Sequence, residues 1–178
     1  MKTYLTGLMG MALLFIGCAG IPSGVKTVSP FDAVRYQGKW YEIARMDHWF
    51  ERGLNNVIAT YDLRGDGTLD VLNRGFDPQK GRWKEARGKA RFAKEKTVGR
   101  LKVSFFWPFS GAYNVIDLDQ ELYSHAMVCG ANRSYLWILS RTPKISPVIL
   151  ESLIKKAQDW GFDTQKLILV EHDRSDAP

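Results

Sequence analysis

Cysteine is almost missing from this chain: its 178 residues include only Cys18 and Cys129. Small exported domains are commonly stapled by several disulfides, whereas two cysteines allow one such bond at most. A disulfide framework is therefore excluded, and the fold must depend on its apolar core.

Histidine is also scarce, and its spacing excludes the common metal motifs. His48, His125 and His172 are far apart in the sequence, unlike the two histidines of a His-Glu-x-x-His motif. His125 and Cys129 could share one face of a strand, but they would then lie about 13 Å apart along it. That separation is too long for a nucleophile and its base, and Cys129 is better explained as a small buried residue. The sequence predicts no enzyme, no metal site and no cofactor.

Near the N-terminus there is no apolar run long enough to span a membrane. Residues 5–16 are mostly apolar, but about a dozen residues cannot cross a bilayer of roughly 30 Å as a helix. The positive Lys2 before this run and the small Gly17 after it are typical of a secretory signal. The sequence Phe15-Ile16-Gly17-Cys18 resembles the lipobox of bacterial lipoproteins, whose cysteine receives a diacylglyceryl group and becomes the first residue.

This resemblance implies a signal peptide over residues 1–17 and a lipid on Cys18. The alternative is an ordinary signal peptide that is cut near residues 19 and 20. The residue after the cysteine is Ala19, not the aspartate that usually signals retention in the inner membrane. The resemblance therefore points to a lipid-anchored protein of the bacterial outer membrane.

The 161 residues after the signal fit one domain with a sizeable core. Removal of Lys2 leaves 24 basic against 19 acidic residues, a net charge of +5 that would suit an anionic ligand or membrane face. Residues 18–30 are rich in Gly, Pro and Ser without an apolar period, which predicts a tether between lipid and domain. We expect the domain over residues 31–172 and a tail over residues 173–178.

Short apolar runs separated by turn residues follow position 40. Alternating side chains, with one polar and one apolar face, indicate strands in segments such as 82–93 and 99–106. Regular short strands joined by tight turns are typical of a sandwich or a barrel. Eight strands are expected, over residues 40–47, 56–63, 68–77, 82–93, 99–107, 111–118, 124–130 and 134–141.

One amphipathic helix interrupts this pattern late in the chain. Ser146 and Pro147 suit its start, and Gly161 suits its end. Apolar residues recur at spacings of three and four between positions 150 and 160, which predicts a helix packed against the outside of the sheet. A last short strand is expected over residues 166–171.

Three separated blocks resemble the lipocalin family, and in particular bacterial lipocalins related to apolipoprotein D. They cover residues 31–45, which contain Gly38-Lys39-Trp40, then residues 113–119, and finally residues 137–143. The resemblance implies an all-β fold: an eight-stranded antiparallel up-and-down barrel, with a C-terminal helix outside and a short ninth strand. It also implies that Trp40 closes one end of the barrel, that Arg141 lies across its indole, and that Gly38 lets the backbone pass close beneath.

Strand alternation then predicts which side chains face the inside of the barrel. The predicted wall consists of Ala59, Tyr61, Phe92, Val103, Phe105, Tyr113, Val115, Met127, Trp137 and Leu139. Loops over residues 47–55 and 107–109 are expected at the mouth, where exposed aromatics would suit an apolar ligand. The resemblance implies a fatty acid or a lysophospholipid, held for storage or transport in the cell envelope.

Two other functions compete with lipid binding. Basic residues interleave with Trp83 and Phe92 as in some nucleic-acid binders, but the charges alternate with interior residues and the protein is expected to be exported. We therefore expect no nucleic-acid partner. A scaffold or partner-binding module with a filled cavity remains the main alternative, since a fold does not determine a function. A homodimer is also possible.

Overall fold

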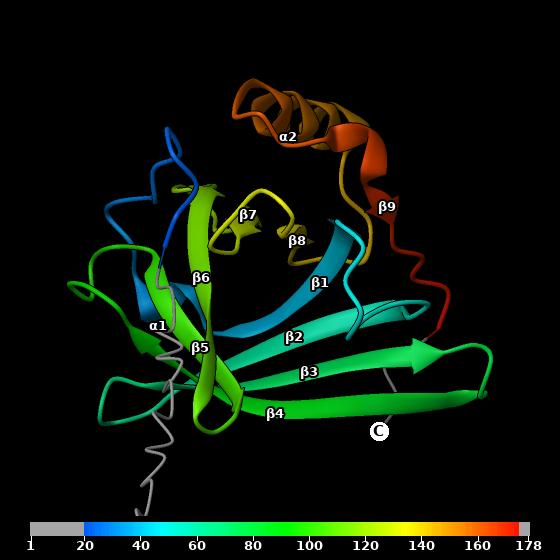
Figure 1. The fold of residues 1–178 in the computed structure, drawn as a ribbon, viewed down its shortest axis with the longest axis horizontal. Coiled ribbons are helices and arrows are strands. Elements are labelled where there is room, and N and C mark those ends of the chain that lie inside the picture. The colour runs from blue at the N-terminus through cyan, green and yellow to red at the C-terminus, as the bar shows by residue number, and fades with distance from the viewer. Residues whose placement is uncertain (1–19, 175–178) are drawn as a thin grey trace, which may run out of the picture.

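The structure is a computed structural model that describes residues 20–174. Eight antiparallel strands form a closed barrel, as the family resemblance implied (Figure 1). Each strand pairs with the next along the chain, and β1 pairs with both β8 and β2, which closes the sheet. The strands are β1 Gly38–Arg45, β2 Asn55–Leu63, β3 Leu69–Asp77, β4 Arg82–Phe92, β5 Arg100–Phe106, β6 Phe109–Leu118, β7 His125–Cys129 and β8 Leu136–Ser140.

The up-and-down topology gives the barrel two different ends. The connections β1–β2, β3–β4, β5–β6 and β7–β8 lie at one end, which we call the mouth. The other three hairpin connections lie at the opposite end, the base, together with the short helix α1 (Ala33–Tyr36). Asp32 caps α1, because its Oδ1 accepts a hydrogen bond from the Val34 backbone N–H at 2.8 Å.

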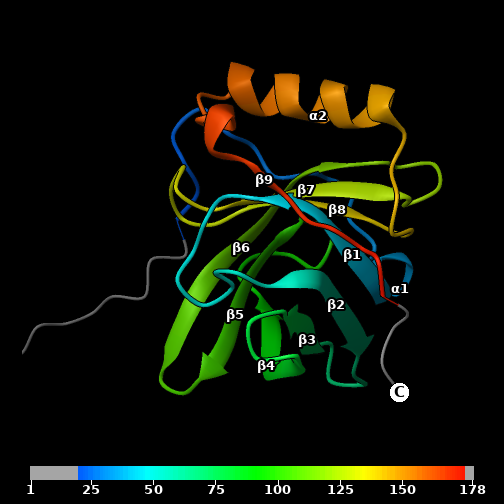
Figure 2. The same cartoon turned by 90° about the vertical axis from the view of Figure 1, so that its right-hand side faces the viewer.

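The apolar residues form two layers, one inside the barrel and one under a helix. The inner layer includes Trp40, Tyr61 and Val115, and it fills the base. The outer layer lies between the sheet and α2 (Pro147–Asp159), which buries Leu153 and Ala157 (Figure 2). Within residues 20–174, α2 and the shorter helices do not reach the length and apolarity needed to cross a bilayer.

The ends of α2 match the sequence prediction only in part. Pro147 occupies the first turn, and Gly161 has the positive φ of 78° that suits a helix exit. Ser146 is the residue at which the helix starts, as expected, but its hydroxyl makes no capping hydrogen bond. The Ser146 carbonyl instead accepts the Leu150 N–H within the first turn.

The segment over residues 20–30, predicted as part of a tether, is bound to the barrel wall. The Val28 N–H donates to the Val115 carbonyl at 2.9 Å, and the Gly99 N–H donates to the Val28 carbonyl at 3.0 Å. Val25 is buried in the outer layer. This part of the tether prediction is wrong because isolated apolar residues, which show no period in the sequence, each find a separate site on the wall.

The C-terminal segment also packs against the barrel. A 3₁₀ turn, Thr164–Lys166, leads into β9 (Ile168–Leu169), which pairs with β1. The backbone N–H groups of Asp173 and Arg174 donate to Asn56 Oδ1 at 3.1 and 3.0 Å. The predicted tail therefore begins with two residues that are held against β2.

Candidate functional site

The base of the barrel is closed by Trp40 and Arg141, as the resemblance implied. The Trp40 side chain is fully buried, and the Arg141 guanidinium carbon lies 3.9 Å from the centroid of the indole ring. Arg141 also donates to three backbone carbonyls, those of Tyr123, Lys39 and Arg35, at 3.2, 2.9 and 2.6 Å. The guanidinium thus joins α1, β1 and the β6–β7 connection over a single aromatic plug.

Gly38 is favoured at this place by its backbone conformation. Its φ of 90° belongs to the left-handed region, which a residue with a Cβ adopts only with strain. A Cβ at this position would lie 3.4 Å from Arg141 Nη1, an ordinary van der Waals contact, so the backbone conformation and not the space argues for glycine. The glycine therefore lets β1 begin directly beneath the arginine.

Three tyrosine hydroxyls form a network above the plug. The Tyr113 hydroxyl lies 2.7 Å from the Tyr36 hydroxyl and 2.8 Å from that of Tyr61. Burial raises the pKa of all three phenols, so they remain neutral at physiological pH. The floor of the interior is accordingly aromatic and uncharged, with its polar groups satisfied by one another.

The inner wall agrees with the strand alternation at every predicted position except Met127. Tyr61, Val115 and Leu139 are buried in the inner layer. The remaining inward side chains are only half-buried although they point into the barrel: Ala59, Phe92, Val103, Phe105, Tyr113 and Trp137. Phe92 ends β4 at the base, where it borders a surface pocket, whereas Val103 and Phe105 lie farther along β5 toward the mouth, where their exposure indicates unfilled space.

Met127 faces the opposite way, so its prediction as an inner-wall residue is wrong. It pairs with Ile138 across β7–β8 and lies in the outer layer beneath α2. Its neighbours Ala126 and Val128 face inward instead. Because α2 covers the outside of β7, both faces of this strand are apolar, and the sequence pattern does not distinguish them.

A buried cluster of charged residues near the mouth was not predicted. Arg45 Nη1 donates to Glu42 Oε1 at 2.7 Å, and Arg45 Nη2 donates to the carbonyls of Glu51 and Leu54 at 3.0 and 2.9 Å. Burial, reinforced by the Glu51 charge, raises the pKa of Glu42, and burial also raises the pKa of Glu51. The cluster ties the β1–β2 loop to the inner wall. Its only sequence signal was the charge of residues 42, 45 and 51 on or beside an apolar strand.

His48 extends this cluster into an aromatic stack. Its ring lies 5.0 Å from the Phe50 ring, 5.3 Å from that of Tyr135 and 4.6 Å from that of Trp137, measured between centroids. Neither ring nitrogen makes a hydrogen bond, and Nε2 lies 3.5 Å from Glu51 Oε2. Burial, with a smaller contribution from Arg45, lowers the pKa of His48 to about 4. His48 is therefore neutral at physiological pH and acts as an aromatic packing residue.

The two loops predicted at the mouth do carry exposed aromatics. They are Trp49 and Phe50 in the β1–β2 loop, and Phe106, Trp107 and Phe109 in the β5–β6 hairpin. His48, in the same loop as Trp49 and Phe50, is buried. We call these five exposed residues the aromatic rim.

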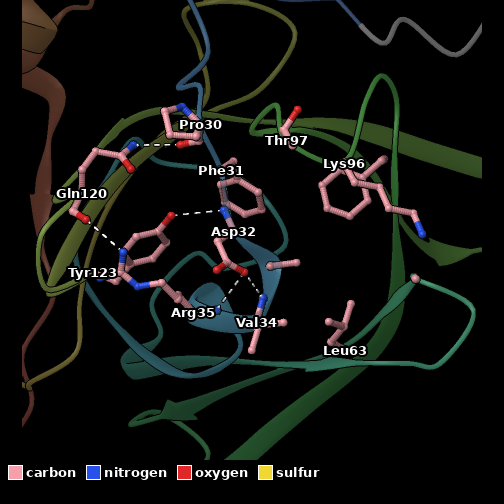
Figure 3. A pocket seen from close by; sticks show the side chains of 13 residues that line it. Pro30, Phe31, Asp32, Val34, Arg35, Leu63, Lys96, Thr97, Gln120 and Tyr123 are labelled. Carbon is pink, nitrogen blue, oxygen red and sulfur yellow. Dashed lines mark hydrogen bonds between the residues drawn. The ribbon is translucent and has the colours of Figure 1, made fainter.

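A surface pocket lies at the base, away from the mouth. It has a volume of about 750 Å³ and is bordered by α1 and by the three base connections (Figure 3). Phe31 and Phe92 form part of its apolar floor, while Lys96 and Gln120 lie at its edge. Asp32 and Arg35 are already bonded to the protein, to the start of α1 and to the Gln120 and Glu121 carbonyls.

The described residues contain no site with the features of a catalytic or metal centre. Among residues 20–174 there is no group of His, Cys, Asp and Glu side chains that could hold a metal ion. Burial raises the pKa of the Cys129 thiol to about 12, so it is not a nucleophile at neutral pH. Cys18, the predicted lipidation site, lies outside the described residues.

Comparison with known proteins agrees with this architecture. Residues 31–172 match the family described as Lipocalin-like domain. The protein named Outer membrane lipoprotein Blc from Vibrio cholerae is 54% identical over 160 residues, covering 90% of this chain and 94% of the relative. The protein of the same name from Escherichia coli is 53% identical over 166 residues, covering 92% and 93%. Apolipoprotein D from Mus musculus is 30% identical over 143 residues, covering 77% and 75%.

Solved structures show the same fold. Insecticyanin from the tobacco hornworm Manduca sexta superimposes with a TM-score of 0.71 at 20% identity, covering 87% of this chain and 88% of that chain. This likeness concerns the fold alone.

Proposed function

Because this chain belongs to the family of lipocalin-like domains, we propose that it is a lipid-anchored outer-membrane protein that holds a fatty acid or a lysophospholipid in its barrel. The bound lipid would be stored or transported within the cell envelope. Binding without turnover is the proposed activity, since Cys129 is an inert thiol and the relatives carry the names of lipoproteins.

The half-buried inner wall is the observation that carries this proposal. Val103 and Phe105 on β5 point into the barrel, yet they are not covered by other side chains as core residues would be. Gly88 lets the Phe105 ring lie directly against β4, because a Cβ on it would lie 2.8 Å from that ring. An acyl chain would cover these surfaces.

The expected affinity follows from the apolar area that such a chain buries. Each methylene contributes about 0.8 kcal/mol, so a chain of about 14 methylenes would gain roughly 11 kcal/mol before the costs of ordering. Micromolar binding requires about 8 kcal/mol, which leaves room for those costs. The buried cation Arg45 is not available to bind a head group, because it is already bonded to Glu42 and to two backbone carbonyls. The head group would therefore remain near the mouth.

The lipid anchor is proposed from the sequence of residues 15–18 and from the names of the relatives. Two or more acyl chains on Cys18 would hold the protein stably, whereas one chain gives only marginal binding. Labelling with a clickable palmitate tests this. Equal label in the wild type and in Cys18→Ala would contradict the anchor.

The cavity is tested by filling it with a larger side chain. Val103→Trp should occupy the space beside Phe105 and lower the affinity for a fluorescent fatty acid at least about tenfold, since the acyl chain loses several methylenes of burial. The matched control is Lys102→Trp, which places the same side chain on the exposed outer face of β5. Urea unfolding of both variants would show that the barrel remains folded.

Two results would separate lipid binding from the alternative function. Lipid found by mass spectrometry in the purified protein would identify the bound class. Absence of lipid, together with no competition by fatty acid or lysophospholipid, would favour a scaffold or a partner-binding module instead. Homodimer formation remains a prediction that sedimentation analysis can test.

A further inference from the structure

The aromatic rim exposes an unusual amount of apolar surface at one end of the molecule. Trp107 is 92% exposed, Trp49 77% and Phe106 76%. Phe50, whose ring contacts that of Trp49, and Phe109, which pairs with Phe106, are exposed as well. Soluble proteins rarely present so many large aromatics together unless the surface contacts a partner or a membrane. Tryptophan in particular prefers the interface between lipid and water.

The N-terminal segment leaves the barrel on this same side. Figure 2 shows the start of the described chain (blue), the β1–β2 loop (cyan) and the β5–β6 hairpin (green) all at the left, while α1 lies at the right. The position of Gly20 is fixed, because its carbonyl accepts a hydrogen bond from the Asn114 side chain at 3.0 Å. Gly20 also lies against Ala131 in the β7–β8 connection, which belongs to the mouth.

The chain length between this fixed point and the predicted lipid is very short. Only Ala19 separates Gly20 from Cys18. Two extended residues span at most about 7 Å, so a lipid on Cys18 would hold the mouth side of the barrel close to the bilayer. A long flexible tether, which would leave the orientation free, is excluded by the bonds that residues 20–30 make with the wall.

Basic residues near the aromatic rim also suit contact with a membrane surface. Lys80 and Arg82 are exposed at the β3–β4 turn, which also belongs to the mouth. Basic residues at this position are attracted to anionic head groups, each contributing about 1 kcal/mol near such a membrane. Aromatic and basic residues together are typical of surfaces that dock on lipid.

From these observations we propose that the mouth of the barrel faces the bilayer that carries the anchor, with the aromatic rim lying in the lipid–water interface. The ligand would then enter the barrel directly from the lipid phase. The inference rests on the proposed function for the lipid on Cys18, but it does not depend on which lipid the cavity holds.

Site-specific labels can test this orientation in the full lipidated protein. Ser110→Cys places a thiol on the β5–β6 hairpin without removing a rim aromatic, and Leu122→Cys places one at the base, where Leu122 is 75% exposed. Each thiol would carry the same fluorophore. Native Cys129 is buried, so it should not react. The labelled proteins are reconstituted in vesicles of phosphatidylethanolamine and phosphatidylglycerol whose acyl chains are brominated.

We expect bromine to quench most of the fluorescence at position 110 and almost none at position 122. Replacing Phe106, Trp107 and Phe109 by serine in the Ser110→Cys background should abolish this quenching. Equal quenching at both positions, or none at position 110, would overturn the proposal. If the fluorescence at position 110 changed with protein concentration and not with bromine, a second copy of the protein would cover the rim. This result would also overturn the proposal.

The test distinguishes this inference from the proposed function. Fatty-acid displacement in the same preparation reports on the cavity, and flotation of the wild type and Cys18→Ala reports on the anchor. Quenching at position 110 without fatty-acid binding would keep the orientation and reject the ligand. Normal binding and flotation without quenching would reject the orientation alone.

Discussion

Replacing Arg141 by alanine should destabilise the barrel by about 3 kcal/mol. Its cation–π contact with the fully buried Trp40 is worth about 1–2 kcal/mol at such a site. Its three hydrogen bonds to carbonyl groups add about 0.5 kcal/mol each, near the low end because water can reach part of this network. A loss of this size is a large fraction of the roughly 5–15 kcal/mol that stabilises a typical domain.

Urea unfolding measures this loss directly. With an m value of about 2 kcal/mol/M, Arg141→Ala should lower the urea midpoint by about 1.5 M. Arg141→Lys should lose less, because an ammonium can remain over the indole but cannot reach three carbonyls at once. The matched control is Arg35→Ala, at the same end of the barrel. Its guanidinium lies 4.0 Å from the centroid of the Tyr123 ring and is exposed, so a loss of only about 1 kcal/mol is expected.

A double-mutant cycle identifies the partner of Arg141. Trp40→Phe and Arg141→Ala should show a coupling free energy of about 1 kcal/mol, since each removes part of the same contact. An unchanged urea midpoint in Arg141→Ala, or a coupling near zero, would refute the assignment of this pair as the closure of the base.

Three further predictions concern stability and reactivity. The pKa of His48 falls to about 4 in the fold and is about 6.5 in the unfolded chain, so between these values the folded state binds fewer protons than the unfolded state, and up to about 3 kcal/mol of stability should be lost as the pH falls from about 6.5 to about 4. His48→Phe should remove this part of the acid destabilisation, as measured by urea unfolding at several pH values. An unchanged pH profile would contradict the burial of a neutral ring. The Cys129 thiol, with its pKa raised to about 12, should react with a thiol reagent at pH 8 only as fast as the protein unfolds, and rapid labelling of the folded protein would show the burial to be incorrect. Asn114→Ala should release Gly20 and destabilise the protein by about 1–3 kcal/mol; faster tryptic cleavage after Lys26 is the expected readout, and unchanged cleavage would mean that other contacts suffice to hold the segment.

Much of this fold could be predicted because its strands carry a strong local signal. In β4, Lys89 and Arg91 face solvent while Ala90 and Phe92 face inward, and this alternation determines the orientation without any tertiary information. The closure of the base was predicted from the resemblance alone. No local pattern connects Trp40 with Arg141, which is about a hundred residues away in the sequence.

The wrong predictions fall where one element covers another. Met127 was misplaced because α2 makes the outer face of β7 as apolar as the inner face. Residues 20–30 were predicted as a tether because Val25 and Val28 are isolated apolar residues, whose sites exist only once the barrel has formed. Both errors have the same physical origin, since burial by a distant element leaves no periodic signal in the segment itself.

The distribution of packing around the barrel explains how one domain can combine stability with an accessible interior. The wall beneath α2 is packed on both faces, with Ile138 on the outside and Leu139 on the inside of β8. Within residues 20–174 no helix covers the opposite wall, and there the inward residues Ala59 on β2 and Val103 and Phe105 on β5 are half-buried. Stability is thus concentrated in the base and the covered wall, where buried apolar area is largest. The uncovered wall near the mouth can then remain unfilled without loss of the fold, because the hydrogen bonds of the closed sheet hold its strands in place whether or not a ligand lies against them.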